Sequence, residues 1–186
     1  MEINLSWDLF LTVFFLVIVA YSVMIGKDQT IKVILSSYIS ILASDGIGNI
    51  AAKIFDKSAI LSKIFAENAA EKVIILLKIG IFIVLTVALT TRGAFDIVIA
   101  EEKNGFLRVV MTIVYGFLSA GLIVSTVLII ISGASIMGGG AFFFQNPIET
   151  IASGSHLVKI MVQNYAFWFS LPAILFVFSS LFGEKE

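Results

Sequence analysis

The feature that most constrains this chain is a series of long apolar segments that carry almost no charge. The first, Leu9–Gly26, has no charged residue in 18 positions. A helix needs about 20 mainly apolar residues to cross the hydrocarbon core of a bilayer. Of the 186 residues, 59% are apolar and 13% are charged, whereas soluble domains are about 25% charged. A globule of this size keeps too much surface in water to hide so many apolar side chains, so we expect a membrane protein.

Five apolar segments follow one another along the chain, at about 9–26, 31–50, 73–91, 106–131 and 160–182. The last one contains Gln163, Asn164 and Pro172, which predicts either a kinked span or a membrane-buried hairpin. None of the segments shows the residue-by-residue alternation of barrel strands. The sequence therefore predicts an all-α, polytopic integral membrane protein with four to five transmembrane helices and a single membrane domain over residues 1–186.

Two of the connections have compositions of their own. Residues 53–72 place apolar side chains near helical spacing with lysines between them, which predicts a juxtamembrane amphipathic helix in the headgroup zone; a solvated loop helix is the alternative. Residues 132–155 include Gly138-Gly139-Gly140 and Phe142-Phe143-Phe144. Glycines disfavour a continuous helix and the aromatic triplet disfavours water, so we expect a Gly/Phe-rich loop that dips into the membrane.

Small residues recur every four positions along two of the spans. The second span carries Ser36, Ser40, Ser44, Gly48 and Ala52, and the fourth carries Thr112, Gly116 and Ala120. On a helix such positions form one stripe, and small residues let helix backbones approach closely in lipid. We therefore expect these two helices to pack together, within one chain or between copies. In the alternative, the serines line a polar conduit.

Asp45 is the strongest candidate for a functional residue. An ionisable group inside a span is costly and is a functional hypothesis by default, so Asp45 is a candidate carrier of a proton or cation, with Asn49 one turn further on. Alternatively, Asp45-Gly46 ends a short second helix at the headgroup level. Lys78 lies five residues into the 73–91 segment, so it either snorkels to the interface or pairs with Asp45.

Composition excludes several classes of site. There is no cysteine, and His156 is the only histidine, so we expect no metal site. Twelve basic against thirteen acidic residues give no basic patch for a nucleic acid. The glycines of Gly46-Ile47-Gly48 follow a membrane helix rather than a buried strand, which argues against dinucleotide binding. We therefore expect no catalytic residue and no cofactor.

Two segments carry a family resemblance. The first hairpin runs from Trp7-Asp8 through an apolar helix to Tyr21-Ser22-Val23-Met24-Ile25-Gly26-Lys27. Later, Asn104-Gly105-Phe106-Leu107-Arg108 leads into Tyr115-Gly116-Phe117-Leu118-Ser119-Ala120-Gly121. Over roughly residues 5–135 the chain resembles the colicin V production (CvpA-like) family of small bacterial inner-membrane proteins. The Gly/Phe-rich loop and the apolar C-terminal segment depart from that family's pattern.

The resemblance implies a multi-pass, non-enzymatic protein of the bacterial inner membrane. Its role would lie in toxin production or export and in envelope homeostasis, and the family offers no catalytic residues to carry over. We expect the lipid bilayer as a partner and self-association through small-residue helix faces. The alternative function is an oligomeric ion channel or small transporter with a polar path near Asp45, whose substrate the sequence does not identify. A membrane enzyme would need Asp45, Lys78 and His156 to converge.

Overall fold

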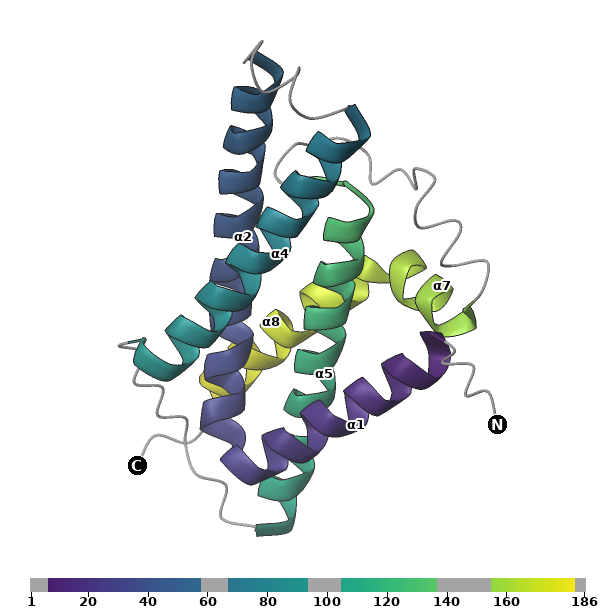
Figure 1. Ribbon diagram of the computed structural model, residues 1–186. Helices are drawn as coiled ribbons and strands as arrows, with labels where there is room; N and C mark the ends of the chain where they lie inside the picture. The colour runs from purple at the N-terminus through teal and green to yellow at the C-terminus, as the bar shows by residue number, and fades with distance from the viewer. Residues whose placement is uncertain (1–6, 58–66, 94–104, 137–154, 183–186) are drawn as a thin grey trace.

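The computed structural model describes residues 7–57, 67–93, 105–136 and 155–182, and within these ranges every regular element is a helix. The helices are α1 (Trp7–Ile25), α2 (Lys27–Lys57), α4 (Glu67–Arg92), α5 (Gly105–Ile131), α7 (His156–Gln163) and α8 (Tyr165–Phe182). α2 and α4 run side by side, α1 crosses α5, and α8 passes behind α5 (Figure 1). The predicted all-α fold is confirmed.

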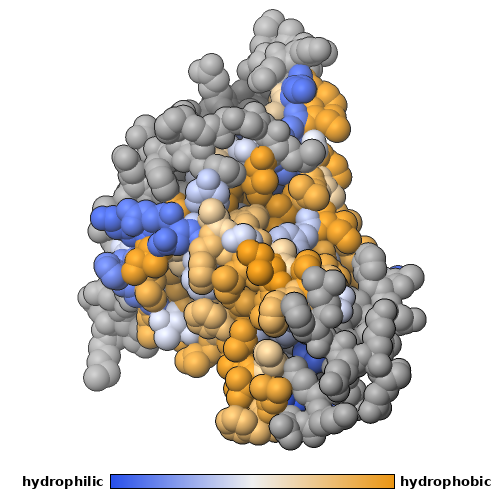
Figure 2. Space-filling view, turned by 180° about the vertical axis from the view of Figure 1, so that it is seen from behind, coloured by the Kyte–Doolittle hydropathy of each residue, from blue (hydrophilic) through white to orange (hydrophobic). Residues whose placement is uncertain are grey.

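Four helices, α1, α2, α4 and α5, are long and apolar enough to cross a membrane by length and composition. α7 and α8 pass the same test only as a pair, bent by 63° at Asn164. The count is therefore four, or up to five with the bent pair, as the sequence predicts. Large apolar side chains such as Leu16, Met24 and Leu76 are 65%, 84% and 71% exposed, and hydrophobic residues dominate the described surface in Figure 2. Such a surface is compatible with a membrane protein.

α1 and α2 meet at a corner made by one residue. Gly26 has a φ of +85°, a left-handed conformation that suits glycine because it lacks a Cβ. Its N–H donates to the Ser22 carbonyl at 2.9 Å, and its own carbonyl accepts from the Thr30 N–H at 3.1 Å. One helix therefore ends and the next begins without a loop between them.

α5 is the central helix. In its spanning window 72% of the residues are buried, against 11% in the windows of α1 and α4. Gly116 of α5 lies against α1, where an added Cβ would be 2.7 Å from the Ser22 Cβ. An added Cβ at Gly121 would overlap the indole of Trp168 in α8. The space beside Gly116 and Gly121 is therefore occupied by two other helices of the same chain, α1 and α8.

Two tyrosine hydroxyls hold α8 against the other helices. Tyr38 of α2 donates to the Phe169 carbonyl at 2.6 Å, and Tyr115 of α5 donates to the Leu175 carbonyl at 3.2 Å. Pro172 lies between these two carbonyls and is buried. Because proline has no N–H, it interrupts the backbone bonding of a helix, and the tyrosines supply donors on either side of that interruption.

The predicted connections fall largely outside the described residues. Of the expected amphipathic helix at 53–72, residues 53–57 continue α2 and residues 67–72 belong to α4, while residues 58–66 lie outside the described part. Of the expected Gly/Phe-rich loop, residues 137–154 also lie outside it. The structure describes the two ends of that loop, where Ser135 and Ser155 form hydrogen bonds to other helices.

Candidate functional site

Asp45 and Lys78 form a buried ion pair between α2 and α4. The Lys78 Nζ is 2.7 Å from the Asp45 Oδ1, and the two residues are only 5% and 3% exposed. α2 continues to Lys57, so the interpretation that Asp45-Gly46 ends a helix is wrong. The Lys78 side chain is buried and directed at Asp45. The pairing that the sequence left open is present.

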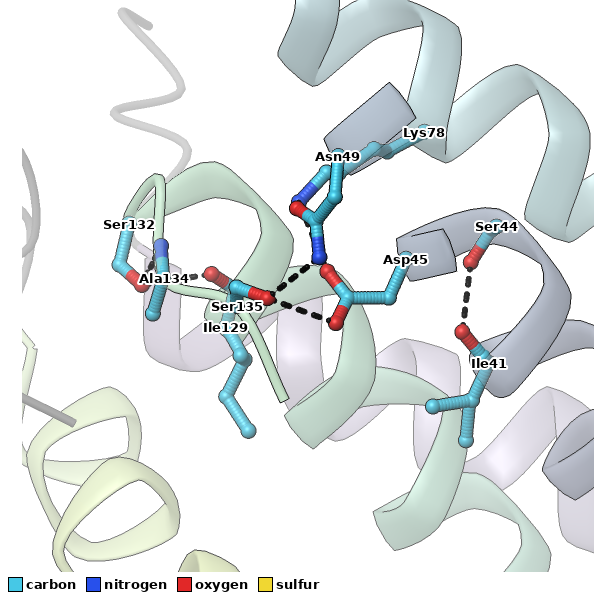
Figure 3. A network of polar contacts seen from close by, with 9 residues as sticks. All are labelled: Ile41, Ser44, Asp45, Asn49, Lys78, Ile129, Ser132, Ala134 and Ser135. Carbon is cyan, nitrogen blue, oxygen red and sulfur yellow. Dashed lines mark hydrogen bonds and ion pairs between the residues drawn. The ribbon is translucent and has the colours of Figure 1, made fainter. Parts of the chain in front are cut away.

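Asn49 and Ser135 extend the pair into a ring of four polar residues (Figure 3). Lys78 also donates to the Asn49 Oδ1 at 3.1 Å. The Asn49 Nδ2 donates to the Ser135 Oγ at 2.8 Å, and Ser135 donates to the Asp45 Oδ2 at 2.9 Å. Both carboxylate oxygens and both ends of the amide therefore have a partner, and the ring joins α2, α4 and the turn after α5.

The turn that carries Ser135 has a fixed local structure. Gly133, at a φ of +73°, donates to the Ile130 carbonyl at 3.0 Å, and this left-handed residue ends the helix in the manner of a C-terminal cap. The Ser132 hydroxyl donates to the Ile129 carbonyl and accepts from the Ala134 N–H at 3.3 Å. These bonds direct the chain back toward α2, where Ser135 meets Asp45.

Gly48 makes room for the Lys78 side chain. An added Cβ at Gly48 would overlap the Lys78 Cγ and Cε and lie 2.8 Å from its Cδ. The aliphatic stem of Lys78 therefore lies directly over Gly48, which precedes Asn49 in the sequence and follows Asp45 by three residues. Only glycine at this position leaves the stem a straight course to the carboxylate.

Because this ion pair is buried, its two charges are stable only together. Taking a lone charge out of water costs several kcal/mol per ion, and the mutual attraction repays this only when the remaining donors and acceptors are satisfied. The ring supplies those extra bonds through Asn49 and Ser135. The site is therefore uncharged as a whole while each of its members remains polar, and it cannot lose one charged member without a large penalty.

The predicted small-residue stripe is buried and serves several contacts. Ser36, Ser40 and Ser44 are at most 1% exposed, and Ala120 is also buried. Ser40 donates to the Ser36 carbonyl at 2.7 Å and Ser44 to the Ile41 carbonyl at 3.0 Å, so these hydroxyls bond within their own helix. α2 and α5 do contact each other. Gly48, however, is in contact with the Lys78 side chain of α4, and Gly116 is in contact with α1.

A second aspartate site lies at the start of α7. Ser155 caps this helix: its hydroxyl accepts from the Val158 N–H at 3.1 Å. The same hydroxyl donates to the Asp8 Oδ1 at 2.5 Å, and the Leu157 N–H donates to that oxygen at 3.1 Å. The first turn of α1 is thus tied to the first turn of α7. His156, the only histidine, is exposed there, and the described residues contain no cluster of metal-ligating side chains.

Sequence reasoning found part of this arrangement and missed the rest. Asp45, Asn49 and Gly48 were singled out, and their sequence spacing already places them on adjacent turns of one helix. Ser135 and Ser155 were missed because both lie in the segment expected to be a Gly/Phe-rich loop that dips into the membrane. For Ser155 a signal exists: a serine followed by the apolar pattern of residues 156–163 is typical of a helix start.

Fold and site together define an all-helical chain, in its described part, with a charged polar ring between apolar helices. Comparisons with protein-family models, with curated proteins and with solved structures find no match to this chain.

Proposed function

We propose that this chain is a multi-pass protein of the bacterial cytoplasmic (inner) membrane with a non-enzymatic role in toxin production or export and in envelope homeostasis. The four apolar helices support the membrane location, because their exposed side chains suit lipid. The pattern over residues 5–135 that resembles the colicin V production family supports the role. No cofactor is part of this proposal.

The observation that carries the non-enzymatic role is the polar ring itself. Asp45, Lys78, Asn49 and Ser135 bond to one another across α2, α4 and the turn after α5. In an enzyme, groups of this kind converge on a cleft that receives a substrate. Here they hold three segments of the chain together, as expected of a scaffold that presents its helices to other membrane proteins.

Self-association belongs to the proposal as well. The positions first expected to mediate it, Gly48 and Gly116, are filled by Lys78 and Ser22 of the same chain. A homo-oligomer would therefore use the outward apolar faces of α1 and α4. Crosslinking in native membranes, with cysteines introduced one at a time on those faces, would detect it cleanly because the chain has no cysteine.

The role is tested by complementation. The chain is expressed in a colicin V producer whose own family member has been deleted, and toxin release into the medium is measured. We expect release to be restored by the wild type and by an exposed-surface control such as Leu76→Val, but not by Lys78→Ala. Wild-type chain that resists alkaline extraction from the membrane yet fails to restore release would refute the role while upholding the location.

A second candidate function, an oligomeric ion channel or small transporter, is favoured by the ionisable pair inside apolar helices. Such groups commonly mark ion pathways. Purified protein in liposomes discriminates between the two candidates. An ion flux that vanishes with Asp45→Asn supports transport, whereas tight vesicles formed around correctly folded protein support the scaffold.

A further inference from the structure

Two oxygen atoms of the polar ring hold a single cation, and Ser135 is bonded to both of the residues that supply them. The Lys78 ammonium sits 2.7 Å from the Asp45 Oδ1 and 3.1 Å from the Asn49 Oδ1. The Ser135 Oγ lies 2.9 Å from the other carboxylate oxygen of Asp45. Carboxylate, amide and hydroxyl oxygens are the ligands that hard cations prefer. The ring is thus built like a cation site in which a tethered ammonium takes the place of the ion.

We propose that Asp45 and Asn49, with Ser135 bonded to both, form a binding site for a small monovalent cation, Na⁺ or K⁺, which displaces the Lys78 ammonium toward the aqueous end of α4. The inference requires the membrane location and is independent of a role in toxin export. It gives the polar ring a ligand, in addition to its role in holding the helices together.

Charge decides the class of ion. Asp45, Asn49 and Ser135 together carry one formal charge, the carboxylate of Asp45, and they stand among apolar helices. A monovalent cation neutralises that charge as the ammonium does. A divalent cation would leave one positive charge uncompensated within the ring, and an uncompensated buried charge is strongly destabilising. When Na⁺ or K⁺ binds, the charge of Lys78 moves to water and the site again sums to zero.

Lys78 has a route by which to leave. Side chains of a helix lean toward its N-terminus, which for α4 is the end at Glu67. Glu71 is exposed and lies two helical turns before Lys78, about 10 Å along the axis. The Lys78 stem lies over Gly48, where no Cβ obstructs it. An ammonium that leaves Asp45 can therefore snorkel along α4 toward water and toward the carboxylate of Glu71.

The ion has an approach from the same end. Asn49 and Ser135 are only half-buried, unlike Asp45 and Lys78. The Glu71 Oε1 would be 3.2 Å from a Cβ added at Gly133, so this exposed carboxylate stands beside the turn that carries Ser135. It is placed to attract cations to the turn.

No other described charge competes for the site. The remaining charged side chains described near this end of α2 and α4, Lys53 and Lys72, are exposed. Arg108, the charged residue of α5, lies in the first turn of that helix, at the opposite end from Ser135. Asp8 of α1 is engaged by Ser155.

The test measures how accessible Lys78 is in the wild-type protein. Purified protein in detergent is treated with formaldehyde and a reductant, which methylate lysine amines, in NaCl, in KCl, or in choline chloride of equal ionic strength. Choline is too large to enter the ring. Peptide mass spectrometry then follows each lysine. We expect Lys78 to be methylated at least about tenfold faster in NaCl or KCl, while the exposed Lys53 and Lys72 react equally in all three salts.

Variants locate the effect. In Asn49→Ala, which keeps the ion pair but removes one ligand, the cation concentration that exposes Lys78 should rise about tenfold or more, the range typical of lost metal-site contacts. In Lys78→Met, NaCl and KCl should raise the unfolding temperature above its value in choline chloride, because the cation replaces the missing ammonium. Asp45→Asn combined with Lys78→Met should abolish that rise.

Three results would overturn the proposal. One is equal protection of Lys78 in all three salts. Another is a salt effect that exposes Lys53 and Lys72 as much as Lys78, because that reports general loosening. The last is an Asn49→Ala variant that responds to the same cation concentration as the wild type, because the amide would then be no ligand.

Discussion

Two aspartates bind serines in the described part of the chain, and they are held in different ways. Asp45 lies within α2, is 3% exposed, and has a lysine for a counter-ion. Asp8 lies in the first turn of α1 and its partners are the Ser155 hydroxyl and the Leu157 N–H at the start of α7. One carboxylate is neutralised by a full charge, and the other by a hydroxyl and the positive end of a helix.

The difference teaches what each site can do. The Asp45 site cannot lose a partner without stranding a charge among apolar side chains, so it holds α4 and the turn after α5 firmly against α2. The Asp8 residue is only half-buried and lies at a helix end, where water can replace a lost bond. Ser135 and Ser155 also stand on either side of residues 137–154, so the two sites fix where that segment leaves and rejoins the helices.

Of the substitutions considered, breaking the ion pair should lower the free energy of unfolding the most. Asp45→Asn leaves the Lys78 ammonium buried without a counter-ion, and we expect the free energy of unfolding to fall by about 3–5 kcal/mol. The measurement is a denaturant titration in detergent micelles with choline as the salt cation.

The matched control removes both charges. Asp45→Leu with Lys78→Met strands no charge, and buried ion pairs replaced by apolar residues are often close to neutral in stability. We expect the double variant to be clearly more stable than Asp45→Asn. If the double variant were as unstable as the single one, the ion pair would not be the source of the penalty.

Filling the space beneath Lys78 should cause the next largest loss in the free energy of unfolding. Gly48→Ala pushes the lysine stem off α2, and overpacking of this kind costs about 1–3 kcal/mol. Gly80→Ala is the control, because Gly80 has no atom within 4 Å of an added Cβ and alanine is the better helix former by about 1 kcal/mol. In the same titration we expect Gly48→Ala to lower the free energy of unfolding and Gly80→Ala to raise it. Equal changes would contradict the close contact between Gly48 and Lys78.

Much of the fold can be predicted because it depends on short stretches of sequence. Apolar segments of spanning length predict α1, α2, α4 and α5, because a bilayer imposes both length and composition. Asn164 and Pro172 predict the irregular fifth segment, and the structure shows a bend of 63° between α7 and α8. α2 begins at Lys27, four residues before the apolar segment at 31–50, because Gly26 alone makes the corner.

The site was less accessible to sequence because its geometry is not local. Lys78 and Asp45 lie 33 residues apart, and Ser135 lies 90 residues from Asp45. Which helix faces which is decided by side-chain packing over the whole molecule, and hydropathy does not encode it. Gly48 was assigned to a backbone contact, but its space is filled by a lysine stem, a contact that spacing alone does not distinguish from helix packing.

The cap of α7 should have a smaller effect than either change at the Asp45 site. Ser155→Ala removes the acceptor for the Val158 N–H and the donor to Asp8, and lost caps cost about 0.5–2 kcal/mol. Because α7 is short, the change should be local. Hydrogen exchange should speed up in the first turn of α7 and stay unchanged in α2 and α4, and faster exchange in α2 would contradict the separation of the two sites.

The same substitution at both aspartates gives the sharpest comparison. Asp8→Asn keeps a side-chain oxygen that can accept from Ser155 and Leu157, and it removes only a charge at a helix N-terminus, where such charges contribute little once solvent and salt screen them. We expect its unfolding midpoint to match the wild type in the titration where Asp45→Asn falls far below it. Raising the salt concentration should leave Asp8→Asn unchanged relative to the wild type. A large loss for Asp8→Asn would mean that its carboxylate has a cationic partner, and the contrast between the two sites would then be one of degree and not of kind.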